Sequence, residues 1–407
     1  MVMPHALEGL RVLDFSWFGA GPMGTKVLAD HGAEVIRVES IMKLDGLRMA
    51  PPFPPTGEGP NLSGYYNNHN SSKLSVTLNM QRPEARDIAL RLVAVSDVVI
   101  DNFNPGILEK WGLAYERLVE VKSDIIQIRM PMLGLTGPHR HWIGFGMTLT
   151  GLCGFNELSG FPNREPAGIG TNYPDYSSNP YHAMFAILSA LHWRRRTGEG
   201  QFIELSQYES TINILHTAVL DYTVNGREAT RRGNRSDIAA PHGAYPCMGE
   251  DRWIAIACEN DAQWAALVEH MGFPDWALEA RFATLVERVA NADALDDKLA
   301  EWTRDQRAED LMWKLQRAGV PAGVVENAQD TLENDAQLRF REHFQRLEHP
   351  EAGVTYYDAP PVRLSKTPGR LRSPAPLLGQ HNGYVFGELL GMSEDEIRRY
   401  TEEGIFA

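Results

Sequence analysis

The sequence predicts an α/β fold built on a doubly wound parallel sheet. Short apolar runs recur through the first 130 residues, and segments with helical spacing of apolar residues lie between them. A glycine-containing turn also links the first apolar run to a helical segment. Strands that alternate with helices favour βαβ units, whose strands are parallel.

Five strands are expected in this first part of the chain. They are RVLDF (11–15), EVIRVE (34–39), LSVTL (74–78), DVVIDNF (97–103) and DIIQIRM (124–130). A helix is expected over TKVLADH (25–31), and another over 83–96, where Pro83 stands near the start and apolar residues recur at helical spacing. The Pro- and Gly-rich stretch 49–64 predicts a long loop, and such loops are often functional.

The second half of the chain changes character. The strongly apolar segment 180–195 predicts a helix, QFIELS (201–206) a strand, and a further helix extends to about residue 222. Residues 223–245 are polar and read as a linker. A strand at 252–258 then opens a region of mostly helical pattern to about 316, and the proline-rich tail 350–380 is expected to be extended.

Composition limits the function classes. The net charge of −14 over 407 residues argues against a general nucleic-acid or membrane-surface binder. No run of apolar residues is long enough to span a membrane, and the N-terminus does not have the pattern of a signal peptide. Three cysteines without a CxxC pair suggest a reducing compartment, so we expect a cytoplasmic protein.

One glycine motif favours a dinucleotide. Gly19, Gly21 and Gly24 have the GxGxxG spacing after a predicted strand, and Glu39 ends the next strand, where a ribose-binding acid would stand. The motif alone is weak evidence, and no group for hydride transfer follows it. An NAD-dependent dehydrogenase is therefore a minor alternative.

The order of several other motifs resembles the class III CoA-transferases, the family of formyl-CoA transferase and carnitine CoA-transferase. The resemblance covers nearly the whole chain. It is carried by LEGLRVLDFSWFGAGPMGTKVLADHGAEVIRVES (7–40), SSKLSVTLN (71–79), DVVIDNFNPGILEKWGL (97–113), TGP (136–138), LHWRRRTGEGQFIELSQYES (191–210), RRGN (231–234), APHGAYP (240–246), GVPAGVVEN (319–327) and APLLGQHN (375–382).

This resemblance implies a particular architecture. Residues 1–222 would form the first part of a large Rossmann-like domain that binds CoA, 223–330 a smaller α+β domain with its linkers, and 331–407 a segment that returns to the large domain. Two chains would interlock as a homodimer, or as a heterodimer with a homologous subunit. Glu39 would then have a structural task instead of holding a ribose.

The resemblance also implies covalent catalysis by Asp175, in the segment just before the apolar helix. Its carboxylate would attack a donor acyl-CoA, and the reaction would pass through an aspartyl anhydride and an aspartyl-CoA thioester before an acceptor acid takes the CoA. Acyl-CoA and carboxylic acids are the implied small-molecule partners. No tightly bound cofactor and no metal are implied.

Six further residues carry over as CoA contacts. Asn102 and Phe103 match residues that line the CoA site, Lys110 matches a cation that contacts the CoA phosphates, and His141 falls where formyl-CoA transferase has a lysine. Phe18 and Lys73 lie in two other matched segments and are expected to contribute. Three of them also have an ordinary structural interpretation: Phe103 as a core residue, Lys110 as a solvated helix residue and His141 as a loop residue.

The chain departs from formyl-CoA transferase near the expected acyl group. Trp17 and Gly19 replace polar residues there, and Ser40 replaces a basic one. These departures disfavour formate or oxalate, and Trp17, Phe18, Phe145 and Tyr176 would suit a bulkier organic acid.

Two alternatives remain within the family. An α-acyl-CoA racemase would use His141 and Asp175 as an acid/base pair, although Trp142 stands closer to the expected histidine position. A non-catalytic subunit is the other alternative, and the presence of Asp175 argues against it.

Overall fold

The computed structural model describes residues 5–407, which divide into two units. Unit 1 holds the residues up to 159 together with 166–229 and 338–407, and unit 2 holds 160–165 and 230–337. The divisions fall at 229/230 and 337/338, where the sequence suggested 222/223 and 330/331. The short excursion of 160–165 into unit 2 was not predicted.

Unit 1 is built on a six-stranded parallel sheet with the strand order β3-β2-β1-β4-β5-β6. The strands are β1 (Arg11–Asp14), β2 (Glu34–Glu39), β3 (Leu74–Thr77), β4 (Val98–Asp101), β5 (Ile126–Arg129) and β6 (Phe202–Glu204). Every strand predicted for this sheet is confirmed; β2 has the predicted bounds, and the other strands are shorter than predicted. Val12 of β1 lies opposite Val35 of β2 and Val98 of β4, which fixes the register at the centre of the sheet.

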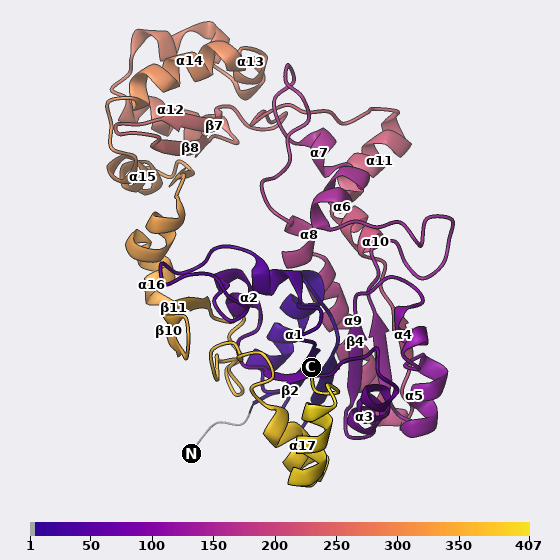
Figure 1. The fold of residues 1–407 in the computed structure, drawn as a ribbon. Helices are drawn as coiled ribbons and strands as arrows, with labels where there is room; N and C mark the ends of the chain where they lie inside the picture. The colour runs from indigo at the N-terminus through magenta and orange to yellow at the C-terminus, as the bar shows by residue number, and fades with distance from the viewer. Residues whose placement is uncertain (1–4) are drawn as a thin grey trace. The chain divides into compact units, whose positions relative to one another are not determined.

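Helices cover both faces of this sheet (Figure 1). Val12 packs into one apolar cluster with α1 (Ala20–Asp30) and α9 (Asn179–Thr197), while the next residue, Leu13, packs into another with α3 (Pro83–Ala94) and α5 (Tyr115–Val121). Successive strand residues point to opposite faces, so a strand buried on both sides must be apolar at every position. The continuous apolar run in β1 therefore has a direct structural cause.

The glycine-rich turn after β1 starts a helix earlier than predicted, at Ala20 instead of residue 25. Pro22 falls in its first turn, where proline is tolerated. A Cβ at Gly21 would lie 2.2 Å from the Cβ of Ser16, and a Cβ at Gly24 would lie 2.9 Å from Cε of Met184. These glycines permit the tight turn and the close packing of α1 on α9.

The C-terminal segment returns to the N-terminal half of unit 1, as Figure 1 shows for its yellow part. The backbone N–H of Asn79 donates to the carbonyl of Ile405 at 2.8 Å, and the ring of Phe386 stacks on that of Phe406 in the core. Residues 350–380 contain no helix, as predicted, but they include β11 (Gly353–Asp358), which pairs with β10 (Phe344–His349).

Unit 2 combines an antiparallel sheet with helices. Its strands are β7 (His242–Pro246), β8 (Trp253–Ala257) and β9 (Ala322–Val324), and its helices are α12 (Asp261–His270), α13 (Leu285–Ala290), α14 (Ala292–Thr303) and α15 (Ala308–Arg317). The predicted strand at 252–258 is β8. The predicted linker is shorter than 223–245, because α11 (His216–Asn225) and β7 occupy its two ends.

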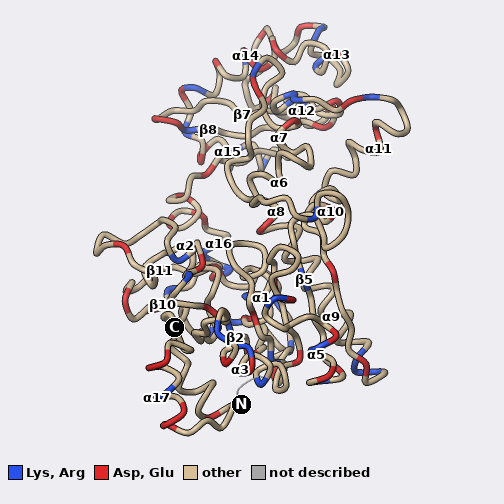
Figure 2. Tube along the Cα trace, turned by 45° about the vertical axis from the view of Figure 1, so that its right-hand side comes forward, with Lys and Arg blue, Asp and Glu red and all other residues tan. Residues whose placement is uncertain are grey.

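The remaining helices belong to unit 1, apart from α16, which crosses the boundary at 337/338. They are α2 (Gly64–His69), α4 (Ile107–Lys110), α6 (Gly146–Leu152), α7 (Phe155–Leu158), α8 (Tyr173–Tyr176), α10 (Gln207–Ile212), α16 (Ala336–Phe340) and α17 (Glu394–Glu402). In the described part of the chain, every helix is too short or too polar to cross a bilayer. Acidic and basic residues are interspersed along both units (Figure 2).

Candidate active site

A cavity of about 900 Å³ opens at the carboxyl end of the parallel sheet in unit 1. Its walls come from the segments that follow β1, β2, β3, β4 and β5, and from residues near Asp175. The connections after β1 and β4 leave toward opposite faces of the sheet, because α1 packs on one face and α5 on the other. Ligands of open α/β sheets bind at such a point, outside the carboxyl ends of the strands.

Asp175 lies in α8 and lines this cavity, although its side chain is only 7% exposed. Two glycines stand against its carboxylate. A Cβ at Gly146 would lie 2.6 Å from Oδ2 of Asp175, and one at Gly19 would lie 3.1 Å from the same atom. Any larger residue at either position would press on the carboxylate, so two backbone segments approach it as closely as the chain allows.

The environment of Asp175 is apolar enough to change its ionisation. Burial raises its pKa from 3.8 to about 7, and a side-chain hydrogen bond with Asn179 works in the opposite direction. No cation contributes to this balance. A carboxyl group poised near neutrality in a cavity is a frequent mark of a functional site.

The turn that carries Gly19 is clamped by Asn102. Its Oδ1 accepts a hydrogen bond from the Trp17 backbone N–H at 2.8 Å, and its Nδ2 donates to the Trp17 carbonyl at 2.7 Å. Asn102 lines the cavity as predicted, but its side-chain amide is already engaged by this pair of hydrogen bonds to Trp17. Asn102 therefore shapes the wall of the cavity.

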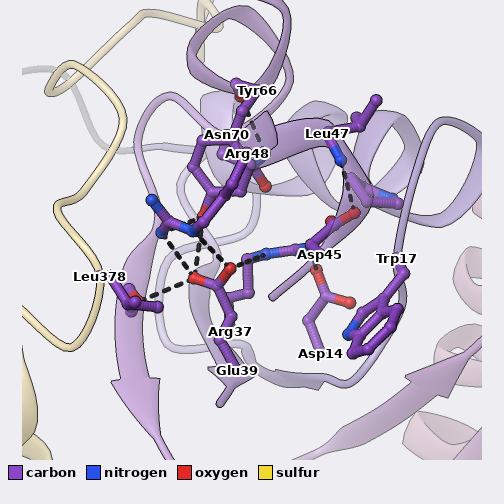
Figure 3. Close-up of polar contacts among 12 residues, drawn as sticks. Asp14, Trp17, Arg37, Glu39, Asp45, Leu47, Arg48, Tyr66, Asn70 and Leu378 are labelled. Atoms are coloured by element: carbon purple, nitrogen blue, oxygen red, sulfur yellow. Dashed lines mark hydrogen bonds and ion pairs between the residues drawn. The ribbon is translucent and has the colours of Figure 1, made fainter. Parts of the chain in front are cut away.

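A second clamp acts on Phe18, which adopts a φ of 59°. The carboxylate of Asp45 accepts from the backbone N–H of Phe18. It also accepts from the backbone N–H of Leu47 and pairs with the guanidinium of Arg37 (Figure 3). Arg37 and Asp45 are both fully buried, so neither charge is stable without the other. This pair ties the segment after β2 to the turn after β1.

Glu39 closes the same buried network. Its two oxygens accept from Nε and Nη2 of Arg48 at 2.8 and 2.7 Å, and Oε2 also accepts from Tyr66 and Ser75. Burial is the largest single influence and opposes ionisation, but Arg48, Arg37 and Ser75 together outweigh it and lower the pKa of Glu39 to about 2. Both oxygens are engaged inside the protein, which agrees with a structural task and leaves no free carboxylate for a ribose.

Aromatic side chains make one side of the cavity apolar. The Trp17 and Phe103 rings meet edge to face at 5.4 Å, Phe103 meets Trp111 at 5.5 Å, and Phe18 contacts Phe145 at 4.8 Å. All five line the cavity. Of the four aromatic residues expected near the acyl group, Trp17, Phe18 and Phe145 line the cavity. Tyr176 is not among the lining residues and packs beside His69.

Three cations line the cavity, namely Lys43, Arg86 and Lys110. Lys110 was predicted. Lys43 and Arg86 were not, because a cation in a loop or helix carries no sequence signal of its own. Lys43 also lies over the Trp17 ring, at 5.4 Å from the centroid. An anionic ligand of this acidic protein would meet its positive charge at these three side chains.

Two predicted contacts lie elsewhere. Lys73 is buried outside the lining, where Nζ donates to the Pro22 carbonyl at 2.8 Å and to Asn70 Oδ1 at 2.9 Å. Burial lowers its pKa to about 7. His141 is exposed, does not line the cavity and accepts a bond from Arg140. Both remain predictions that these positions do not support.

Sequence reasoning missed several residues that build the site. Asp45, Asn179 and Gln207 are polar and buried. Asn179 follows Asp175 by one helical turn and Gln207 lies in the matched segment 191–210, whereas Asp45 lies outside the matched segments. Their polarity within otherwise ordinary segments gave no indication of burial. Within residues 5–407, no cluster of three or more His, Cys, Asp or Glu side chains could hold a metal ion.

Comparison with known proteins decides the family. Residues 7–382 match the model for CoA-transferase family III. The chain belongs to CoA-transferase family III. It is 34% identical to the succinyl-CoA–D-citramalate CoA-transferase of Chloroflexus aurantiacus, over 97% of this chain and 96% of that protein.

Two further similarities support this assignment. The β subunit of the succinyl-CoA–L-malate CoA-transferase of Chloroflexus aurantiacus is 32% identical over 96% of each chain. The crystal structure of a CaiB/BaiF family protein from Brucella suis has a TM-score of 0.87 and 34% identity, covering 95% of this chain and 100% of that one. This family III CoA-transferase is thus an enzyme that transfers CoA between carboxylic acids.

Proposed function

We propose that Asp175 is the nucleophile of this CoA-transferase. The observation that carries the proposal is its position: a buried carboxylate that still borders the cavity, enclosed by the backbones at Gly19 and Gly146. A carboxylate can split acyl transfer into easier steps by forming covalent intermediates. An enclosed site also limits hydrolysis of such intermediates by water.

The proposed cycle begins with attack of an Asp175 oxygen on the thioester carbonyl of the donor. The C–S bond breaks, giving an aspartyl–acyl anhydride and CoA thiolate. The thiolate then attacks the Asp175 carbonyl, releases the donor acid as a carboxylate and leaves an aspartyl-CoA thioester. Each step exchanges one activated acyl bond for another, so no ATP and no tightly bound cofactor are needed.

The second half of the cycle mirrors the first. The acceptor carboxylate attacks the Asp175 carbonyl of the aspartyl thioester, and CoA thiolate leaves. The thiolate attacks the acceptor carbonyl of the new anhydride, which forms the product thioester and regenerates the Asp175 carboxylate. The start of α1 lies beside the Asp175 carboxyl group and has no side-chain cap. Its first backbone N–H groups therefore suit an oxyanion that develops on the Asp175 carbonyl.

Succinyl-CoA is the donor we propose to test first, because both relatives described above are named for it. The aromatic wall formed by Trp17, Phe18 and Phe145 supports the expectation of a fairly bulky acceptor acid. Phe18, Phe103 and Lys110 are predicted CoA contacts that line the cavity, and they are kept in this role. Asn102 also lines the cavity and would act by fixing the turn.

The decisive experiment is mass spectrometry of the intact protein after incubation with succinyl-CoA and trapping with hydroxylamine. We expect an adduct on Asp175 that is absent in Asp175→Ala, together with loss of CoA transfer by at least about 10⁴-fold. Exchange of solvent deuterium into the α-position of an acyl-CoA, without an adduct, would contradict the proposal and support the racemase alternative.

We also propose that the working form is an interlocked dimer with a Rossmann-like large domain in each chain. Its support is an apolar surface on α9, where Tyr181, Phe185 and Leu188 share one face and are 44%, 73% and 44% exposed. A related subunit could replace the second copy, since one relative is named as a β subunit. We place the enzyme in the cytoplasm, where its three free cysteines would stay reduced.

A further inference from the structure

A short line of amide groups runs from the end of β5 to Asp175. Nε2 of Gln207 donates to the backbone carbonyl of Met130 at 2.6 Å, and Nδ2 of Asn179 donates to Oε1 of Gln207 at 3.2 Å. The Asn179 side chain also acts on the Asp175 carboxyl, whose pKa it lowers by hydrogen bonding. Asn179 is completely buried, and Gln207 is 8% exposed and lines the cavity.

The Met130 carbonyl determines the direction of this line. A backbone carbonyl only accepts hydrogen bonds, so Gln207 must present its NH₂ group there and its oxygen toward Asn179. Asn179 must then present its own NH₂ group on the side of Gln207 and Asp175. Its Oδ1 points away and, within residues 5–407, has no hydrogen-bond partner.

We propose that Asn179 and Gln207 are positioning residues that hold an N–H donor against the Asp175 carboxylate and so favour its ionised, nucleophilic form. The inference rests on the proposed role of Asp175. If the Asn179 amide could flip, it would present its oxygen to Asp175 instead. A carbonyl oxygen beside the Asp175 carboxyl group favours the protonated form of that group. Gln207 prevents this reversal because its own orientation is fixed by Met130.

The groups around Asp175 that are named below do not stabilise its ionised form, so this stabilisation falls to the Asn179 amide. The segments packed against the carboxylate contribute Gly19, just before α1, and Gly146 of α6, neither of which has a charged side chain. Tyr65 of α2 interacts electrostatically with Asp175, and burial raises the pKa of its hydroxyl, so Tyr65 remains neutral near pH 7. Burial disfavours the charged carboxylate, and the Asn179 hydrogen bond opposes that effect.

The test is the pH profile of kcat/KM for CoA transfer from succinyl-CoA, measured for wild type, Asn179→Leu and Gln207→Met. Both replacements are close in size to the native side chains and remove the amide. We expect the midpoint of the rising limb to move up by about one pH unit in each, because a hydrogen bond to a charged group is lost.

Gln127→Met is the matched control. Gln127 is also fully buried and donates from Nε2 to a backbone carbonyl, that of Leu113 at 3.0 Å, but it does not line the cavity. Its pH midpoint should equal that of wild type. Thermal melting of every variant separates a loss of folding from a change in the site, and Asn179→Ala replaces Asn179→Leu if the latter does not fold.

Lower kcat/KM with an unchanged midpoint in both variants would overturn the inference, since a purely structural role predicts that result. An equal shift in Gln127→Met would overturn it as well. The role of Asp175 is tested separately: if Asp175→Ala keeps its activity, the proposed nucleophile is wrong whatever the amide variants do.

Discussion

Asp175 is a carboxyl group in a buried environment, where the free energy of folding disfavours its ionised form. Its ordinary pKa is 3.8 and burial raises it to about 7, so the folded protein holds the proton more tightly than the unfolded chain does. The stability that this group contributes is complete below pH 3.8 and is lost as the pH rises through 7. The proposed nucleophile is thus maintained at neutral pH at the expense of stability, a relation common at active sites.

Asp175→Asn should therefore stabilise the fold, and more so at high pH. The interval from 3.8 to about 7 corresponds to at most about 4 kcal/mol at pH 8, since one pH unit is about 1.4 kcal/mol. We expect urea unfolding to show a gain that grows between pH 5 and pH 8 while CoA transfer is lost. A gain that is the same at both pH values would show that the Asp175 carboxyl is not strained by burial.

Gly19→Ala tests the close approach to Asp175. The backbone at Gly19 has a φ of −86°, which alanine adopts without strain, but the new Cβ would lie 2.8 Å from the Asp175 Cβ. The carboxylate must move, and a displacement of about 1 Å lowers catalysis by about 10²-fold. Gly168→Ala is the control, since a Cβ there meets nothing within 4 Å. Steady-state kinetics that do not distinguish the two variants would contradict the assigned geometry.

At the scale of elements, the segment between β2 and α2 owes its position to one buried ion pair. Asp45→Ala would leave the Arg37 guanidinium buried with only the more distant carboxylates of Asp14 and Glu39, each 3.6 Å away. We expect a loss of about 3 kcal/mol in urea unfolding and a raised KM for succinyl-CoA, because Phe18 and Lys43 lose their support.

An exposed ion pair provides the comparison for that variant. Asp395 pairs with Arg398 on α17, where both side chains are largely exposed. Asp395→Ala should cost less than about 1 kcal/mol and leave KM unchanged. Equal losses in Asp45→Ala and Asp395→Ala would mean that the Arg37–Asp45 pair does not hold the segment.

At the scale of the whole molecule, the apolar face of α9 predicts self-association. Phe185 is 73% exposed in the single chain, and an apolar surface of this kind usually contacts a partner. We expect light scattering to show a dimer for wild type and a monomer, or a strongly reduced folded yield, for Phe185→Glu. Val286→Glu changes an equally exposed but separate position, 78% exposed on α13, and should stay dimeric. A monomeric wild-type protein would contradict the dimer.

The sequence by itself determined the parallel sheet and the position of its strands, and it singled out Asp175 as the residue proposed to be the nucleophile. Apolar runs such as that of β1 are local signals, because burial on both faces requires every residue to be apolar. The motif around Asp175 is also local. By contrast, the expected start of α1 was five residues too late, since the reasons for Gly21 and Gly24 lie in Ser16 and Met184, which the helix meets only in three dimensions.

Only the tertiary structure decided how the site is supported. The clamps on Trp17 and Phe18 come from Asn102 and Asp45, and the amide facing Asp175 is oriented from Met130, far away in sequence. The same structure leaves Lys73 and His141 outside the cavity lining and brings Lys43 and Arg86 into it. Composition and spacing record what a residue can do chemically. Which groups it meets depends on contacts between distant segments, and burial then sets the charge and orientation of the group that acts.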